Sequence, residues 1–150
     1  MKIVINTNFG GYSISPLATK ELAKRKGKEC FFFTTDLKTH EYTQVSIEEA
    51  EKAFCWFAYS VTNPQDYRLD ERDADGLFKS ANERAEKISL SDIAKDRSDK
   101  DLIDVVEILG KKANGSHAEL KIVEIPDYVE WEIDEYDGLE HIAEVHRTWS

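Results

Sequence analysis

Apolar runs and helix-capping residues predict the elements at the start of the chain. Residues 2–6, Lys-Ile-Val-Ile-Asn, predict a buried strand. Ser15 is a good N-cap, Pro16 suits the first position of a helix and Gly27 is a good stop, so a helix is expected over residues 16–26. Two further strands, joined by a turn, are then expected at 29–35 and 41–45.

The next pattern has the period of a helix. Ser46 and Glu49 form a capping box. An apolar stripe follows at helical spacing, made of Ile47, Ala50, Phe54, Phe57, Ala58 and Val61. This stripe predicts one helix that continues to Asn63-Pro64, where the proline ends it.

The final part of the chain predicts one helix and then strands. Ser98 and Asp101 begin a helix whose apolar positions are Leu102, Val105, Val106 and Leu109. Asn114-Gly115 ends this helix, and Asp137-Gly138 is a hairpin turn. Strands are expected at 119–125, 129–136 and 139–146. In the middle strand Val129, Trp131 and Ile133 alternate with Glu130, Glu132 and Asp134, which places the acidic residues on one face.

These elements predict an α+β fold in which helices pack on one face of a mostly antiparallel sheet. A chain of 150 residues is expected to form a single domain, residues 1–150. Residues 64–98 are charged and poor in large apolar side chains, which predicts an insertion that leaves the core. A lid over a site is the alternative interpretation of this segment.

The charge of the chain is unevenly distributed. The net charge is −10, although residues 1–30 carry +4, and residues 119–144 contain ten carboxylates and one lysine. Such a surface repels the phosphate backbone and excludes binding to duplex nucleic acid. The acidic segment is interpreted as a solvated face, with a DNA-like surface for a basic partner as the alternative.

Other features place the protein inside the cell. The longest apolar run, residues 53–59, is too short to span a bilayer, and no secretory signal is recognised at the N-terminus. Cys30 and Cys55 lie in apolar stretches and are expected to be small core residues, not a disulfide framework. We therefore expect a reduced cytoplasmic setting without membrane attachment.

The first turn of the chain is the main candidate for a ligand site. Phe9-Gly10-Gly11-Tyr12-Ser13 lies between a strand and a helix start, a geometry that offers backbone N–H groups to an anion. A dinucleotide fingerprint and a P-loop are both absent. The alternative is a plain turn that needs positive φ. The predicted ligand-binding residues are Phe9, Gly10, Gly11, Tyr12, Ser13, Ser15, Arg147 and Trp149.

The last two of these residues come from the C-terminal tail. Arg147 would meet an anion and Trp149 would stack on a planar ring, so that the tail closes the pocket over the glycine loop. Alternatively, a buried Trp149 indole pins the end of the sheet.

Catalytic and metal-binding patterns are weak. His141 and His146 are separated by an odd number of residues, so a strand would place them on opposite faces, and Glu144 with His146 is too small a set for zinc. No nucleophile motif is present, and the carboxylates of residues 130–134 are interpreted as solvated. We therefore expect no metal, no cofactor and no catalysis.

Two segments resemble a family of small uncharacterised bacteriophage and prophage proteins. The first is Met1-Lys2-Ile3-Val4-Ile5-Asn6 with Phe9-Gly10-Gly11-Tyr12-Ser13; the second runs from Gly110-Lys111-Lys112-Ala113-Asn114-Gly115 through Glu119-Leu120-Lys121-Ile122-Val123-Glu124-Ile125-Pro126 to His146-Arg147-Thr148-Trp149. The resemblance implies a phage accessory protein in bacterial cytoplasm and favours a non-catalytic binder. It supplies no catalytic residue.

Three hypotheses about function follow. The first is a binder that sequesters a small phosphate-bearing ligand, such as a nucleotide signal of host defence. The second is an acidic inhibitor of a basic host protein, and the third is a small nucleotide-acting hydrolase that uses carboxylates with His141 or His146. The partner is accordingly a small ligand or a host protein, and assembly of identical copies is compatible with each hypothesis.

Overall fold

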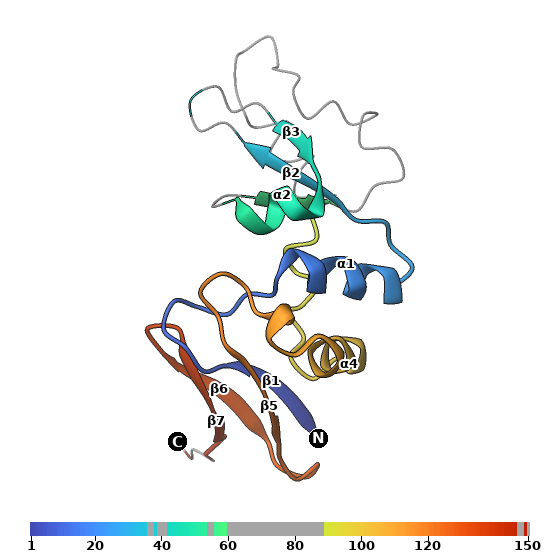
Figure 1. Ribbon diagram of the computed structural model, residues 1–150. Helices are drawn as coiled ribbons and strands as arrows, with labels where there is room; N and C mark the ends of the chain where they lie inside the picture. Colours follow the sequence, from blue (N-terminus) through green and yellow to red (C-terminus); the bar gives the residue numbers. More distant parts are fainter. Residues whose placement is uncertain (36–37, 39–41, 54–55, 60–88, 147–148, 150) are drawn as a thin grey trace. The chain divides into compact units, whose positions relative to one another are not determined.

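The α+β class predicted from the sequence is confirmed by the computed structural model, which contains helices and small antiparallel sheets (Figure 1). The structure describes residues 1–35, 38, 42–53, 56–59, 89–146 and 149. We expected a single domain, whereas the chain divides into two compact units, Met1–Ala18 with Ala94–Ser150, and Thr19–Ile93. Among the described helices, none has the length and apolar character needed to cross a membrane.

The first unit is built on a strand pair that joins the two ends of the chain. Strand β1 (Lys2–Asn6) pairs antiparallel with β5 (Leu120–Glu124), with Ile3 opposite Val123. Ile3, Val4 and Ile5 of β1 are buried. The sequence predicted three consecutive strands near the C-terminus without a partner for the first, and the structure pairs this strand, β5, with β1 and not with the strand that follows it.

The two strands after β5 form a hairpin of their own. Strands β6 (Trp131–Tyr136) and β7 (Leu139–Glu144) are joined by the predicted turn, in which Asp137 and Gly138 have φ values of +50° and +86°. The predicted alternation is confirmed, since Trp131 and Ile133 are half-buried while Glu132 and Asp134 are exposed.

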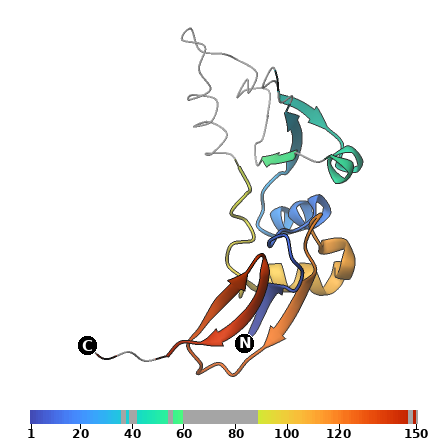
Figure 2. The ribbon, with the colours of Figure 1, turned by 90° about the vertical axis from the view of Figure 1, so that its left-hand side faces the viewer.

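Helix α4 (Lys100–Leu109) covers the β1–β5 pair with an apolar face (Figure 2). Its N-cap is Asp99, whose side chain accepts from the amide of Asp101, and not Ser98 as predicted. The predicted apolar stripe supplies buried Leu102, Val105 and Val106, to which the structure adds Ile103. A 3₁₀ turn, η2 (Gly110–Ala113), follows the helix.

Helix α1 (Pro16–Arg25) confirms the predicted start and stop signals. The Ser15 hydroxyl accepts a hydrogen bond from the amide of Ala18 at 3.1 Å, and Gly27 has a φ of +69°. From Thr19 onward the helix belongs to the second unit. The core of this unit consists of Ala23, Phe32, Ala50 and Leu90.

The second unit also contains the main error of the sequence analysis. Helix α2 begins at the predicted capping box but spans only Ile47–Lys52, and Ala53 is extended with φ −76° and ψ 135°. Residues Trp56–Tyr59 form strand β4, which pairs with β2 (Phe31–Thr35), and β3 (Tyr42–Val45) lies on the other side of β2. Aromatic residues favour strands, and the ladder to β2 outweighs the helical spacing of the apolar stripe.

The predicted insertion at 64–98 lies mostly in residues 60–88, outside the described residues. Its described last part, residues 89–98, does not leave the core, because Leu90 and Ala94 are buried. Arg97 belongs to the first unit and bonds to β1. The backbone amide of Val4 donates to the carbonyl of Arg97 at 2.9 Å, and the guanidinium of Arg97 donates back to the carbonyl of Val4 at 3.2 Å.

Arg97 also pairs with Glu140 of β7 through two hydrogen bonds, at 2.9 and 3.0 Å. The side chains of Arg97 and Glu140 are 15% and 7% exposed, and Glu140 accepts a further bond from the backbone amide of Asn6. Arg97 therefore links β1 to the β6–β7 hairpin. We call these contacts the Arg97 clamp.

Replacing Arg97 with alanine should destabilise the first unit. Glu140 would remain buried without its cation, and loss of one partner of a buried pair costs about 3 kcal/mol or more. Urea unfolding followed by far-UV circular dichroism measures this loss. The matched change Lys100→Ala breaks an exposed pair with Asp104 and should cost less than about 0.5 kcal/mol. Equal effects of the two substitutions would contradict the importance of the clamp.

Candidate functional site

The predicted glycine loop is packed against two other turns. Gly10 and Gly11 have φ values of +119° and +91°, as a turn of this kind requires. A Cβ atom built on Gly138 would overlap the amide nitrogen of Gly11, and one on Gly10 would lie 2.8 Å from Cβ of His117. A Cβ on Gly115 would overlap the hydroxyl of Ser13. These three turns, around Gly10–Gly11, Gly115 and Gly138, are called the glycine junction.

Several donors expected to bind an anion already have partners inside the protein. The amide of Gly10 donates to the carbonyl of Asp137 at 3.2 Å. The amide of Ser15 donates to the carbonyl of Ala113 at 2.9 Å, while its hydroxyl caps α1. Within the described residues, the amide of Gly11 and the hydroxyl of Ser13 make no hydrogen bond to the protein. The loop thus offers fewer donors than the sequence predicted.

Tyr12 belongs to the Arg97 clamp. Its hydroxyl donates to the carbonyl of Ala94 at 3.0 Å, and the guanidinium carbon of Arg97 lies 3.1 Å from the centre of its ring. Burial raises the pKa of Tyr12 to about 12, although Arg97 acts in the opposite direction. The ring is therefore occupied by an internal cation and is not free to stack on a ligand.

The clamp is completed by groups that sequence reasoning missed. The side-chain amide of Asn6 donates to the carbonyls of Gly138 at 2.6 Å and Asn8 at 2.7 Å, and its oxygen accepts from the amide of Glu119. One indication was present in the sequence. In the predicted strand 139–146, Glu140 shares a face with Ile142, and a carboxylate on an apolar face needs a buried partner.

Within the C-terminal tail after His146, the structure describes Trp149. Trp149 is 89% exposed, so the alternative of a buried indole is wrong. Arg147 lies outside the described residues. Phe9, at the start of the loop, is 57% exposed and forms no part of a described pocket. The closure of the loop by Arg147 and Trp149 stays a prediction.

The histidines of the hairpin face solvent. Nε2 of His141 lies 3.4 Å from Oδ2 of Asp134 on the opposite strand, and both side chains are about two-thirds exposed. The strand register places Glu144 beside Trp131, on the other face of the hairpin. Among the described residues, no group of three or more His, Cys, Asp and Glu side chains is arranged to hold a metal ion.

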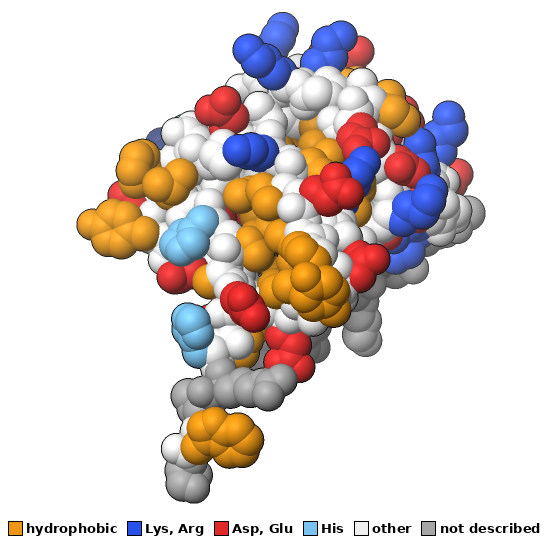
Figure 3. Space-filling view, turned by 90° about the horizontal axis from the view of Figure 1, so that it is seen from below, with side chains coloured by type: hydrophobic (Ala, Val, Ile, Leu, Met, Phe, Trp, Pro, Cys, Tyr) orange, Lys and Arg blue, Asp and Glu red, His pale blue; other side chains and the backbone are white. Residues whose placement is uncertain are grey.

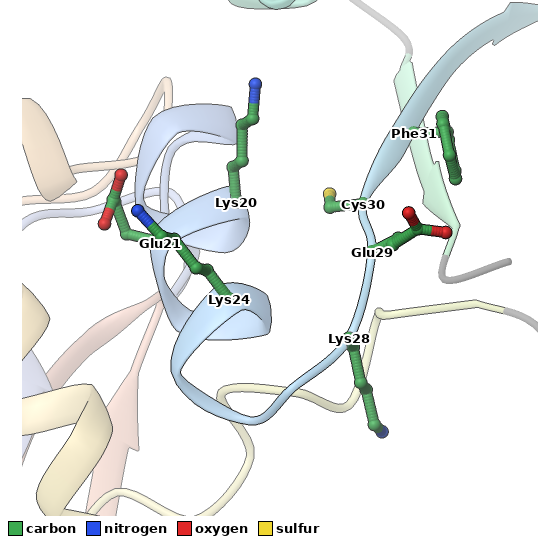
Figure 4. A pocket seen from close by; sticks show the side chains of 7 residues that line it. All are labelled: Lys20, Glu21, Lys24, Lys28, Glu29, Cys30 and Phe31. Atoms are coloured by element: carbon green, nitrogen blue, oxygen red, sulfur yellow. The ribbon is translucent and has the colours of Figure 1, made fainter. Parts of the chain in front are cut away.

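A pocket of about 350 Å³ lies in the second unit, where the sequence predicted no site. Its walls come from α1 and from the segment that leads into β2 (Figure 4). The lining residues are Lys20, Glu21, Lys24, Lys28, Glu29, Cys30 and Phe31.

The side chains of this lysine pocket differ in their directions. Figure 4 shows Cys30 pointing toward α1, whereas the three lysines diverge: Lys20 points upward, Lys24 extends to the side of Glu21, and Lys28 points downward. Burial raises the pKa of Cys30 to about 11, and the charge of Lys20 partly offsets this effect. The pocket therefore combines a neutral thiol with ammonium groups on flexible stems, a combination that can adapt to an anion.

No protein-family model, curated protein or solved structure matches this chain. The assignment of a site therefore depends on the geometry alone.

Gly138→Ala should be far more damaging than Gly11→Ala. Both glycines have positive φ, which costs an alanine about 1–2 kcal/mol. Only at Gly138 would the new methyl group also overlap a neighbouring backbone, whereas nothing lies within 4 Å of a Cβ at Gly11. Urea unfolding should show a loss of roughly 3 kcal/mol or more for Gly138→Ala. Similar losses for the two variants would show that the junction is not closely packed.

The Cys30 thiol should react slowly with iodoacetamide at pH 8. In a Cys55→Ser background it is the sole thiol, and a pKa of about 11 in place of 9.0 lowers the thiolate fraction about hundredfold. The rate should rise with pH and reach half of its maximum near pH 11. The same variant unfolded in guanidinium chloride is the control and should react like an ordinary cysteine. A plateau below pH 9 would contradict the assigned environment.

Proposed function

We propose that this protein is a non-catalytic binding protein that holds a small phosphate-bearing ligand in the lysine pocket. The observation that carries the proposal is the pocket itself, whose lining includes Lys20 and Lys24 of α1 in a protein with a net charge of −10. Lysine ammonium groups bind phosphate as point charges and need no fixed fork geometry.

The size and lining of the pocket define the ligand class. Small-molecule pockets span about 300–1,000 Å³, so a pocket of about 350 Å³ suits a ligand no larger than a mononucleotide. Phe31 lies on the opposite side of the strand from Cys30, as Figure 4 shows, and does not stack across the pocket. Charge therefore contributes more to recognition than stacking on a base.

The glycine loop supports this proposal less well than the lysine pocket does. The Gly10 amide, both Ser15 groups and the Tyr12 hydroxyl are bonded within the protein. An anion at the loop would be left with the Gly11 amide and the Ser13 hydroxyl. In the cell, such a protein would be a phage accessory protein that sequesters a nucleotide signal of host defence. The sequence resemblance to bacteriophage proteins is the sole support for this role.

Isothermal titration with inorganic phosphate, AMP and ATP tests the proposal on the full chain. At least one of the three should bind, and Lys20→Gln and Lys24→Gln should each weaken binding about tenfold, because each removes a charge-assisted hydrogen bond. Lys100→Gln, an exposed lysine of α4, is the matched control and should leave binding unchanged. A bound ligand should also slow the alkylation of Cys30.

Two results would overturn the proposal. One is the absence of binding by all three anions at low ionic strength. The other is binding that survives both lysine substitutions and leaves the alkylation of Cys30 unchanged. Turnover of a bound nucleotide that is lost in His141→Ala would favour the hydrolase hypothesis over sequestration.

A further inference from the structure

The outer edge of β6 is an unpaired sheet edge. β6 pairs with β7 on one side, and within the described residues no strand pairs with it on the other side. The backbone amide of Val145 donates to the carbonyl of Glu130. This bond shows that Glu130 and every second residue after it direct their backbone groups toward β7. Because backbone groups alternate along an antiparallel strand, Glu132 and Asp134 face β7, whereas Trp131, Ile133 and Glu135 present their N–H and C=O groups outward.

The side chains around this edge have two distinct faces. Trp131 and Ile133 are half-buried on one face, and Glu132 and Asp134 are exposed on the other. Tyr136, the last residue of β6, is 78% exposed. Figure 3, which views the side where both termini lie in Figure 1, shows a strip of orange hydrophobic side chains bordered mostly by red acidic ones, with blue basic ones at one end.

The charge of the segment limits what can pair with this edge. Residues 122–146 contain no lysine or arginine. A second copy of β6 would place carboxylates opposite carboxylates, which is destabilising and is a common means of preventing edge-to-edge association. A basic strand would replace this repulsion with attraction.

We propose that the outer edge of β6 binds an extended basic segment of a protein partner as an added strand. The backbone groups of Trp131, Ile133 and Glu135 supply the hydrogen bonds. Basic side chains of the partner lie opposite Glu132 and Asp134, and apolar ones lie opposite Trp131 and Ile133. The expected partner sequence therefore alternates lysine or arginine with apolar residues. This inference does not depend on the lysine pocket.

A short blocked peptide in which lysine alternates with valine is the probe, added to the ¹⁵N-labelled full chain. Amides facing the new strand should gain protection from hydrogen exchange, at Trp131, Ile133 and Glu135. The amides of Glu132 and Asp134 already bond to β7 and should change little. Alternating protection distinguishes strand addition from charge attraction, which would perturb the acidic face without alternation.

Two matched controls accompany this experiment. The same peptide carrying N-methyl groups on the residues that face β6 should bind about tenfold more weakly, whereas N-methylation of the alternate residues should have little effect. Glu132→Gln should weaken binding more than Glu119→Gln, which removes one exposed carboxylate outside the hairpin.

Three results would overturn the proposal. These are no binding, protection without alternation, and concentration-dependent pairing of two β6 strands in the absence of peptide.

Discussion

The buried ion pair between Arg97 and Glu140 is the interaction on which the first unit depends. Removing both charges from water is costly, and the cost is offset because both carboxylate oxygens of Glu140 and both terminal nitrogens of Arg97 make hydrogen bonds. Glu140 accepts two bonds from Arg97 and one from the amide of Asn6, while the guanidinium also contacts Val4 and the Tyr12 ring. One side chain thereby connects β1, the first loop and the hairpin.

This arrangement changes the meaning of the glycine loop. With the hairpin held against β1, the turn at Gly138 lies on Gly10 and Gly11 with no space for a side chain between them. Close packing explains the missing Cβ atoms at Gly10, Gly115 and Gly138, whereas Gly11 meets only the need of its turn for positive φ. The glycines of this loop thus have a packing role in the unit, whether or not the loop binds an anion.

The two proposed binding surfaces differ in charge and in the way they bind. The lysine pocket of the second unit offers ammonium groups to a small anion. The edge of β6 in the first unit offers backbone hydrogen bonds among carboxylates to an extended cation. Since each surface is complete within its own unit, a ligand at one does not require occupation of the other.

The sequence alone determined the features that depend on neighbouring residues. Ser15 and Gly27 delimit α1, Ser46 and Glu49 cap α2, and Asp137-Gly138 closes the hairpin, because caps and turns are satisfied within a few residues. The tertiary structure decided everything that depends on distant partners. It made a strand of Trp56–Tyr59 through pairing with β2, brought Arg97 to Glu140 and gave the Gly10 amide of the predicted ligand loop a partner inside the protein. Long-range pairing and burial override local periodicity, because they satisfy backbone groups and charges that local structure leaves unpaired.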